Sequence, residues 1–153
     1  MGYGRINTYY ALCEVLELLP PITVSSDETW DEPVFSLYDI VVETGNTLTI
    51  TSTVYMGTNT TFIIEPGAKV IVDGGTITNY NFCGHEDNLW QGIEVWGDSD
   101  EHQFTDINGN YQQGYLELKN NAMIENAIIA VELSNPDDDD YRGGIVFANN
   151  AVF

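Results

Sequence analysis

Residues 45–79 read GNTLTITSTVYMGTNTTFIIEPGAKVIVDGGTITN, and the order of apolar and polar residues in this segment indicates the fold class. Apolar side chains alternate with polar ones over short runs that are rich in Val, Ile and Thr. Gly, Pro, Asn or Asp separates one run from the next. A period of two in such segments is typical of β-strands joined by tight turns. The stretch therefore predicts several short strands and an all-β region.

Pairs of apolar residues spaced by two recur along the chain with a longer period. The pairs that begin at Leu48, Val70, Ile93 and Leu116 advance by 22, 23 and 23 residues, and the next pair begins 29 residues later at Ile145. A repeat of about 22–23 residues with three short strands predicts a parallel β-helix, in which each coil stacks on the preceding one. The alternative is an immunoglobulin-like sandwich, whose strands recur at about 8–12 residues without a longer register.

Asparagine pairs support the stacked arrangement. LKNNAMIENA at 118–127 and FANNAVF at 147–153 share the pattern apolar-x-Asn-Asn-Ala-apolar, 29 residues apart, and VDGGTITN at 72–79 is a looser copy. Asn tolerates the left-handed backbone of tight corners, and stacked amides can bond from coil to coil. The alternative is that these are ordinary polar turn residues.

The N-terminal part of the chain follows a different period. Apolar residues recur at spacings of three and four over 6–19, which predicts one short α-helix that the following Pro-Pro pair ends. We interpret 1–20 as the helical tail of a preceding domain or as a cap on the solenoid, and 21–38 as a linker. Residues 39–153 are the predicted β-helix. Because NNAVF stops within a repeat, we expect truncation at the C-terminal end, where further coils would stack.

The charge of the chain restricts its partners. It carries 24 acidic residues against four basic ones, a net charge of −20. Nucleic acid and anionic membrane surfaces require basic patches, so both are excluded as partners. No apolar run approaches the roughly 18 residues of a membrane span, so none is predicted. The acidity favours solubility outside the cell, or the collection of calcium ions by carboxylates.

Short motifs in 39–153 resemble the right-handed parallel β-helix repeats of large secreted bacterial proteins. They are Pro66-Gly67-Ala68, Asp73-Gly74-Gly75, Trp90-Gln91-Gly92-Ile93, Glu125-Asn126-Ala127 and Gly143-Gly144-Ile145. The predicted fold class is therefore all-β, a right-handed parallel β-helix solenoid of about 22–23 residues per coil, preceded by one short α-helix. The resemblance implies a non-catalytic extension beside an adhesin or enzyme domain. The broader pectin-lyase-like superfamily also includes polysaccharide lyases and hydrolases.

The opening GYGRINTYYAL resembles the last turn and helix of a subtilisin-like serine peptidase domain. Gly2, Gly4, Asn7 and Ala11 carry the resemblance, whereas Thr8 stands where that family usually has alanine. The resemblance implies an appendage whose catalytic domain lies upstream, because the peptidase family's catalytic segments do not occur in this sequence. A secretion signal would also lie outside this chain.

One loop has the spacing of a calcium site. Asp106, Asn108, Asn110 and Glu117 stand at the first, third, fifth and twelfth positions, although Tyr111 occupies the sixth, where glycine is expected. Ca²⁺ is the cofactor that this pattern predicts, and a solvated loop is the alternative. CGHED at 83–87 offers zinc ligands, but a second ligand pair is missing from the sequence.

Aromatic residues cluster around the longest loop, at 98–113. Exposed, they would stack on sugar rings; buried, they would cap the coils. The candidates for glycan binding are Trp90, Trp96, Tyr111 and Tyr115.

Three strand carboxylates, Glu94, Glu117 and Glu132, are candidates for polysaccharide hydrolysis, which uses paired acids. Alternation makes them equally good solvent-facing strand residues.

These observations predict a structural or binding module without catalytic activity, in a secreted or cell-surface bacterial protein. Its expected partners are glycans or other surface proteins. The alternatives are the appendage of a subtilisin-like peptidase and part of a polysaccharide lyase or hydrolase.

Overall fold

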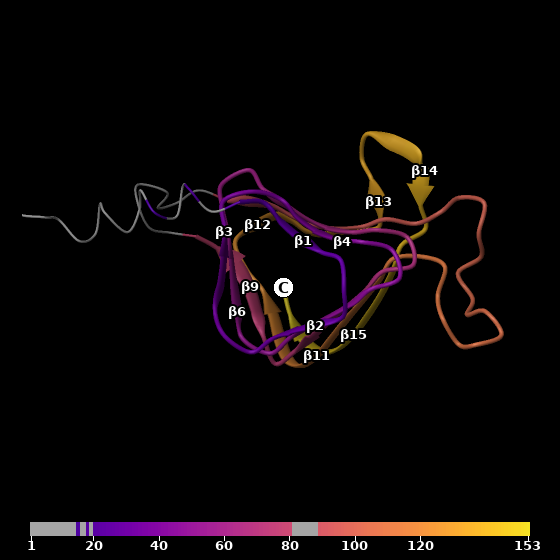
Figure 1. Cartoon of the computed structure of the whole chain (residues 1–153), viewed down its shortest axis with the longest axis horizontal. Coiled ribbons are helices and arrows are strands. Elements are labelled where there is room, and N and C mark those ends of the chain that lie inside the picture. The colour runs from indigo at the N-terminus through magenta and orange to yellow at the C-terminus, as the bar shows by residue number, and fades with distance from the viewer. Residues whose placement is uncertain (1–14, 16–17, 19, 81–88) are drawn as a thin grey trace, which may run out of the picture.

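The computed structural model describes residues 15, 18, 20–80 and 89–153, and the statements below concern these residues. Their regular secondary structure is β-strand, with almost no helix (Figure 1). In chain order the strands are β1 (Ile22–Val24), β2 (Glu28–Trp30), β3 (Val34–Ser36), β4 (Ile40–Val42), β5 (Thr47–Ile50), β6 (Thr53–Met56), β7 (Thr61–Ile64), β8 (Lys69–Asp73), β9 (Thr76–Asn79), β10 (Trp90–Val95), β11 (Tyr115–Ile124), β12 (Ala127–Glu132), β13 (Ser134–Asn135), β14 (Asp138–Arg142) and β15 (Ile145–Val152).

Most of the helix predicted over 6–19, the peptidase-like opening and the CGHED motif lie outside the described residues, so these three predictions stay predictions. In the part of the chain that the structure covers, no helix is long and apolar enough to cross a bilayer.

The strands pair in parallel across long sequence separations. One sheet has the order β1-β4-β7-β10-β12, and the other contains β2-β5-β8-β11 and β3-β6-β9-β11, with β15 added to β11. We call the sets β1–β3, β4–β6 and β7–β9 layers, because each strand of the first two sets pairs with the strand three places later in the chain. In the fourth layer, β10 takes the first position and the long β11 takes the other two, because β11 pairs with both β8 and β9. The fifth layer consists of β12 and β15. This arrangement is compatible with a β-helix-like solenoid.

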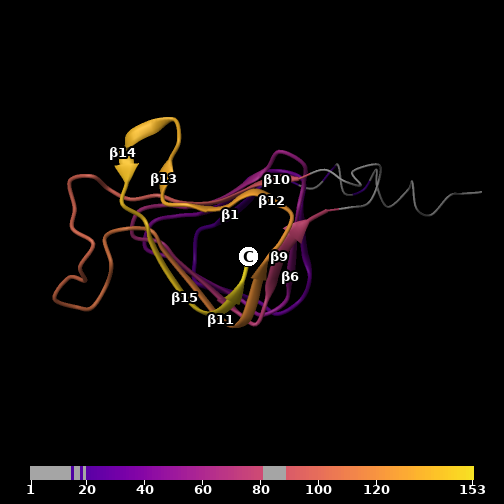
Figure 2. The ribbon, with the colours of Figure 1, turned by 180° about the vertical axis from the view of Figure 1, so that it is seen from behind.

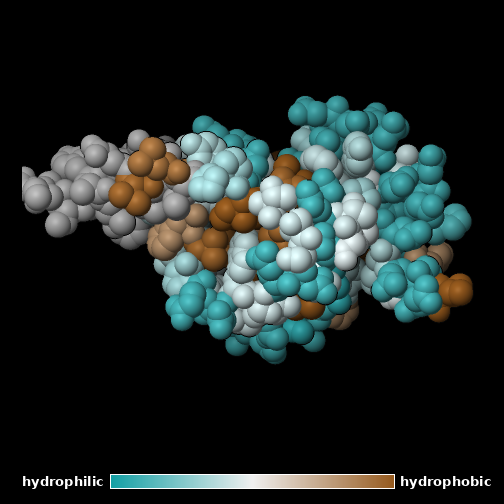
Figure 3. Space-filling view, viewed as in Figure 1, coloured by the Kyte–Doolittle hydropathy of each residue, from teal (hydrophilic) through white to brown (hydrophobic). Residues whose placement is uncertain are grey.

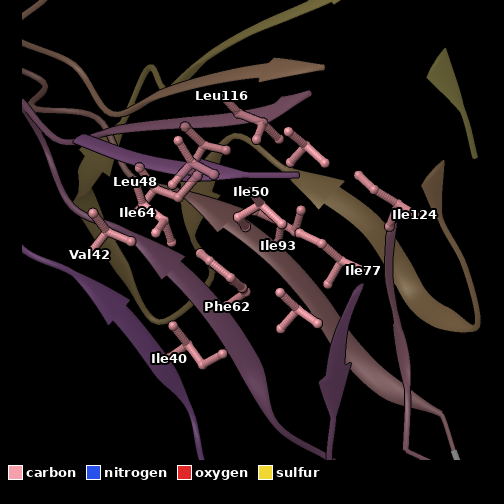
Figure 4. Packing of buried hydrophobic residues seen from close by; sticks show 14 of the residues in the cluster. Ile40, Val42, Leu48, Ile50, Phe62, Ile64, Ile77, Ile93, Leu116 and Ile124 are labelled. Carbon is pink, nitrogen blue, oxygen red and sulfur yellow. The ribbon is translucent and has the colours of Figure 1, made fainter. Parts of the chain in front are cut away.

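The layers surround one common core. Figures 1 and 2 show the strands arranged around a central space, while the loop between β10 and β11 and the antiparallel hairpin β13–β14 project from the same side. Figure 4 shows that side chains of successive strands fill that space. Leu48, Val70 and Leu116 occupy equivalent positions on β5, β8 and β11, and all three are fully buried. Burial of these stacked apolar side chains drives the layers together.

The first layer corrects the prediction that 21–38 is a linker. Strands β1 to β3 lie within this segment and pair in parallel with β4 to β6. Ile22 and Val24 stand opposite Ile40 and Val42, so the apolar residues of this segment do alternate with the period of two that is typical of strands. Each strand is only three residues long and acidic residues separate them, which hid the pattern.

The register also differs in part from the prediction. Leu48 pairs with Val70, as the series predicted, but Val70 then pairs directly with Leu116. Ile93 was wrongly placed between the last two, because it pairs with Phe62 on the other sheet. Leu116 stands opposite Val146 rather than the predicted Ile145. The 22-residue period therefore holds between β5 and β8, and projecting segments lengthen the later layers.

Asparagine takes the role that its spacing predicted. Asn120, Asn121 and Asn150 have φ of 57°, 65° and 60°, in the left-handed region. The side-chain amide of Asn150 donates to the Oδ1 of Asn121 on the layer below, at 2.9 Å. Asn120 donates to Asp73 Oδ1 at 2.6 Å in the same way. Asparagine therefore both turns the chain at these corners and links successive layers.

We expect Asn121→Ala to lower the free energy of unfolding by about 1–2 kcal/mol, because alanine is strained at positive φ and cannot accept the Asn150 hydrogen bond. Asn121→Gly loses the same bond but tolerates the backbone, so its loss should be smaller. Urea unfolding followed by circular dichroism measures both. A glycine variant that is less stable than the alanine variant would contradict this role.

Candidate functional site

A groove of about 440 Å³ lies where the loop between β10 and β11 meets the turns that precede β5 and β8. We call it the tyrosine groove. The lining residues that carry the argument are Asn46, Lys69, Asp106, Asn110, Tyr111 and Tyr115. Tyr115 and Lys69 stand opposite each other on β11 and β8, so the parallel pairing fixes one wall.

Gln113, which the sequence did not single out, holds the base of the loop. Its side chain is 1% exposed, yet each polar atom has a partner. The amide nitrogen donates to the carbonyls of Asp98 and Glu101 at 2.9 Å, and the amide oxygen accepts from the Asp98 N–H. A buried, fully bonded amide of this kind rigidifies the loop that carries Tyr111. One Gln in a polar run gives no signal that would have identified this role.

Asp106 organises the tip of the loop. Its Oδ1 accepts the backbone N–H groups of Asn108 and Asn110, each at 2.8 Å, and its Oδ2 accepts the Asn108 side chain. The hydrogen bond from Asn110, followed by those from Asn108 and Gly109, holds the pKa of Asp106 below its ordinary value. The carboxylate therefore stays charged at neutral pH.

The two tyrosines of the groove are stacked on each other. Their ring centroids are 4.7 Å apart with an interplanar angle of 11°, and the ammonium of Lys69 lies 5.1 Å from the Tyr115 centroid. Burial, followed by the charge of Glu117, raises the pKa of the Tyr115 hydroxyl. Both rings are half-buried, so they are firmly placed and still reach solvent.

The other predicted calcium ligand, Glu117, has different partners. Its carboxylate oxygens lie 3.6 Å from Lys69 Nζ and 3.7 Å from Lys119 Nζ, and Lys119 also approaches Asp73 at 3.6 Å. Within residues 20–80 and 89–153, no three His, Cys, Asp or Glu side chains gather as a metal site. The calcium assignment stays a prediction, and the Asp106 loop would be its centre.

The two tryptophans among the glycan-binding candidates do not line the tyrosine groove. Trp90 is 0% exposed in the core, where its indole N–H donates to the Glu125 carbonyl at 2.8 Å. Trp90 is therefore one of the buried aromatic residues, and neither face of its ring is accessible to a sugar. Trp96 donates to Glu94 Oε2 at 2.8 Å and contacts the ring of Tyr141 at 5.2 Å.

A second cavity, of about 330 Å³, holds two of the three candidate acids. Glu94 and Glu132 are direct register partners on β10 and β12, and both line it. Burial raises the pKa of Glu94, and the charges of Glu132, Asp137 and Asp39 add to the rise against the opposing Trp96 hydrogen bond. Glu117 is not part of this pair.

Glu94→Gln should be more stable than the wild type at pH 7, by about 0.5 kcal/mol after solvent screening. The raised pKa means that the folded state binds the proton more tightly than the unfolded state. Wild-type stability therefore falls as pH rises from the ordinary value of 4.5 through the folded pKa. Glutamine still accepts from Trp96 and carries no charge, so the difference should disappear below about pH 4. Urea unfolding at pH 4 and pH 7 measures it, and a variant less stable at pH 7 would contradict the assignment.

Comparisons of this chain with protein-family models, with curated proteins and with solved structures found no match.

Proposed function

We propose that this chain is a non-catalytic structural and glycan-binding module of a secreted or cell-surface bacterial protein. The observation that carries the proposal is the stacked pair Tyr111–Tyr115 in the tyrosine groove. The C–H groups of a sugar ring bear partial positive charge, and they pack on the negative face of an aromatic ring. The amides and the carboxylate beside the rings supply the few polar contacts that orient a ligand.

The finer fold assignment belongs to the same proposal. The chain would form a right-handed parallel β-helix in which each layer is one coil. The support is the order of parallel pairs, each joining strands about one layer apart along the chain. Connections between parallel strands of one sheet are right-handed in about 98% of cases, because strand twist favours that hand.

The fifth layer is the proposed contact for further coils. Phe153 is 63% exposed, and Val146 and Ala151 of β15 are only partly buried, whereas their register partners Leu116 and Ala122 on β11 are fully buried. Asn150 continues the amide contacts that join the corners of the layers below. A further layer of parallel strands would extend both the apolar stack and the amide ladder, so we propose it as the occupant.

Polysaccharide cleavage is the second candidate, and the Glu94–Glu132 pair favours it. Hydrolases use two carboxyl groups, one of which has a raised pKa and acts as the acid. Release of reducing ends from a polysaccharide by the wild type, and its loss in Glu94→Gln, would support this candidate against the non-catalytic proposal. The proposed peptidase appendage rests on residues 2–11 and is tested by the full reading frame.

Tyr111→Ala tests glycan binding. Affinity electrophoresis through gels that contain β-glucan, mannan, xylan or galactan should retard the wild type in at least one gel. Loss of the Tyr111 face should weaken that retardation about tenfold, which corresponds to about 1.4 kcal/mol.

The matched control is Phe104→Ala, since Phe104 belongs to the same loop, is 82% exposed and does not line the groove. It should migrate like the wild type. Equal retardation of the Tyr111 variant and the wild type, or free migration of the wild type in every gel, would refute the proposed site.

A further inference from the structure

We infer that the tyrosine groove selects uncharged polysaccharides, rejects polyuronates, and receives the sugar on the outer face of Tyr111. This inference rests on the glycan-binding function proposed above and specifies its ligand class.

The face follows from the order of the stack. A centroid distance of 4.7 Å between Tyr111 and Tyr115 leaves no space for an ammonium group between the rings. Lys69 Nζ, at 5.1 Å from the Tyr115 centroid, therefore lies on the other face of that ring. Both faces of Tyr115 are thus covered, and a ligand can stack only on the face of Tyr111 that points away from Tyr115.

The ligand class follows from the charges. Every Lys and Arg side chain in the described part of the chain already faces a carboxylate: Lys69 faces Glu117, Lys119 faces Glu117 and Asp73, and Arg142 faces Asp139. The groove contains Lys69 as its cation, and that ammonium is also held over Tyr115. A uronate carboxylate would have to displace Glu117 to gain a cation. Recognition of carboxylates normally relies on an available Arg fork or ammonium group.

The surroundings oppose an anion as well. Asp106 lines the groove and is charged, because three hydrogen bonds from its own loop stabilise its carboxylate. The chain as a whole carries a net charge of −20, and mainly hydrophilic residues cover the hairpin β13–β14 and the loop between β10 and β11 (Figure 3). Each carboxylate of a polyuronate within about 8 Å of Asp106 is repelled at physiological salt. The hydroxyls of a neutral sugar can instead donate to Asp106 and exchange hydrogen bonds with the Asn110 amide.

A matched pair of probes tests the charge preference. A neutral glucan, mannan or galactan that retards the full chain is compared with the same polysaccharide after its C6 hydroxymethyl groups are oxidised to carboxylates. We expect the oxidised polymer to bind at least tenfold more weakly at 20 mM NaCl. The difference should shrink at 0.5 M NaCl, because salt screens repulsion between charges. Asp106→Asn should improve binding of the oxidised polymer at low salt.

The outcomes separate the two proposals. Equal or tighter binding of the oxidised polymer would overturn the charge preference and leave glycan binding intact. Absence of binding to both polymers would overturn glycan binding and this inference with it. Binding of the neutral polymer that Tyr111→Ala leaves unchanged would overturn the assigned face. Weaker binding of the oxidised polymer that 0.5 M NaCl does not restore would show that shape rather than charge excludes it, which also overturns the inference.

Discussion

Trp90→Ala is expected to lower the free energy of unfolding by about 3–5 kcal/mol, the largest effect of any side-chain truncation proposed for this chain. The indole is fully buried between the fourth and fifth layers, so its removal leaves a cavity that the stacked strands cannot close. The Glu125 carbonyl also loses the indole N–H, its donor at 2.8 Å. Because Glu125 is an exposed residue, water can take the place of the lost donor, and loss of the hydrogen bond adds about 0.5–1.5 kcal/mol.

Trp90→Phe separates the two contributions. Phenylalanine retains most of the apolar volume and removes the hydrogen bond, so the loss should be clearly smaller than for alanine. Urea unfolding followed by far-ultraviolet circular dichroism measures both variants. If Trp90→Ala lowers the free energy of unfolding by less than 1 kcal/mol, the buried placement is contradicted. Trp90 would then again be a candidate for stacking on a sugar at the surface.

Gly92→Ala should destabilise the protein by about 3 kcal/mol or more and release β12 from β10. Gly92 has φ of 126°, a conformation that side chains rarely adopt. A Cβ atom at this position would overlap the carbonyl oxygen of Ile129 on the neighbouring strand. Because Gly92 stands opposite Ile129 at an irregular point of the register, the strands must separate to admit even one methyl group.

Gly45→Ala is the matched control, because Gly45 has φ of 83° and a Cβ there meets nothing within 4 Å. It should cost only the backbone strain, about 1–2 kcal/mol. Hydrogen exchange locates the damage: amides of β12 should lose protection in Gly92→Ala and keep it in Gly45→Ala. Similar losses in the two variants would refute the steric argument.

Much of the fold was readable from local patterns. Alternation located β4 to β12 and β15 but not the hairpin β13–β14, and the Asn-Asn-Ala repeat identified equivalent corners on β11 and β15. The segment 22–36 was misread because strands of three residues give too short a run for alternation to stand out. The place of Ile93 was misread because a spacing of 23 residues matched the period by coincidence, while the actual neighbour was Phe62.

Only part of the candidate site could be predicted from the sequence. Tyr111 and Tyr115 were recognised as aromatic residues near a loop, and Trp90 was grouped with them because sequence proximity does not reveal burial. In the sequence, Glu117 stands at the twelfth position of a calcium-binding loop pattern. In the structure, the parallel pairing of β8 and β11 places it beside Lys69 instead. The roles of Gln113 and of the Glu94–Glu132 pair depend on contacts between segments that the chain order keeps apart.

Alternation, composition and corner residues act locally, so they already specify short stacked strands, asparagine corners and a strongly acidic chain. Which residues share a groove depends instead on contacts between distant segments. The loop between β10 and β11 and the hairpin β13–β14 lengthen the later layers by unequal amounts, so neighbours across layers no longer follow a fixed spacing. Tyr111 therefore reaches the turns before β5 and β8 through the folding of the loop, which Gln113 and Asp106 hold in place.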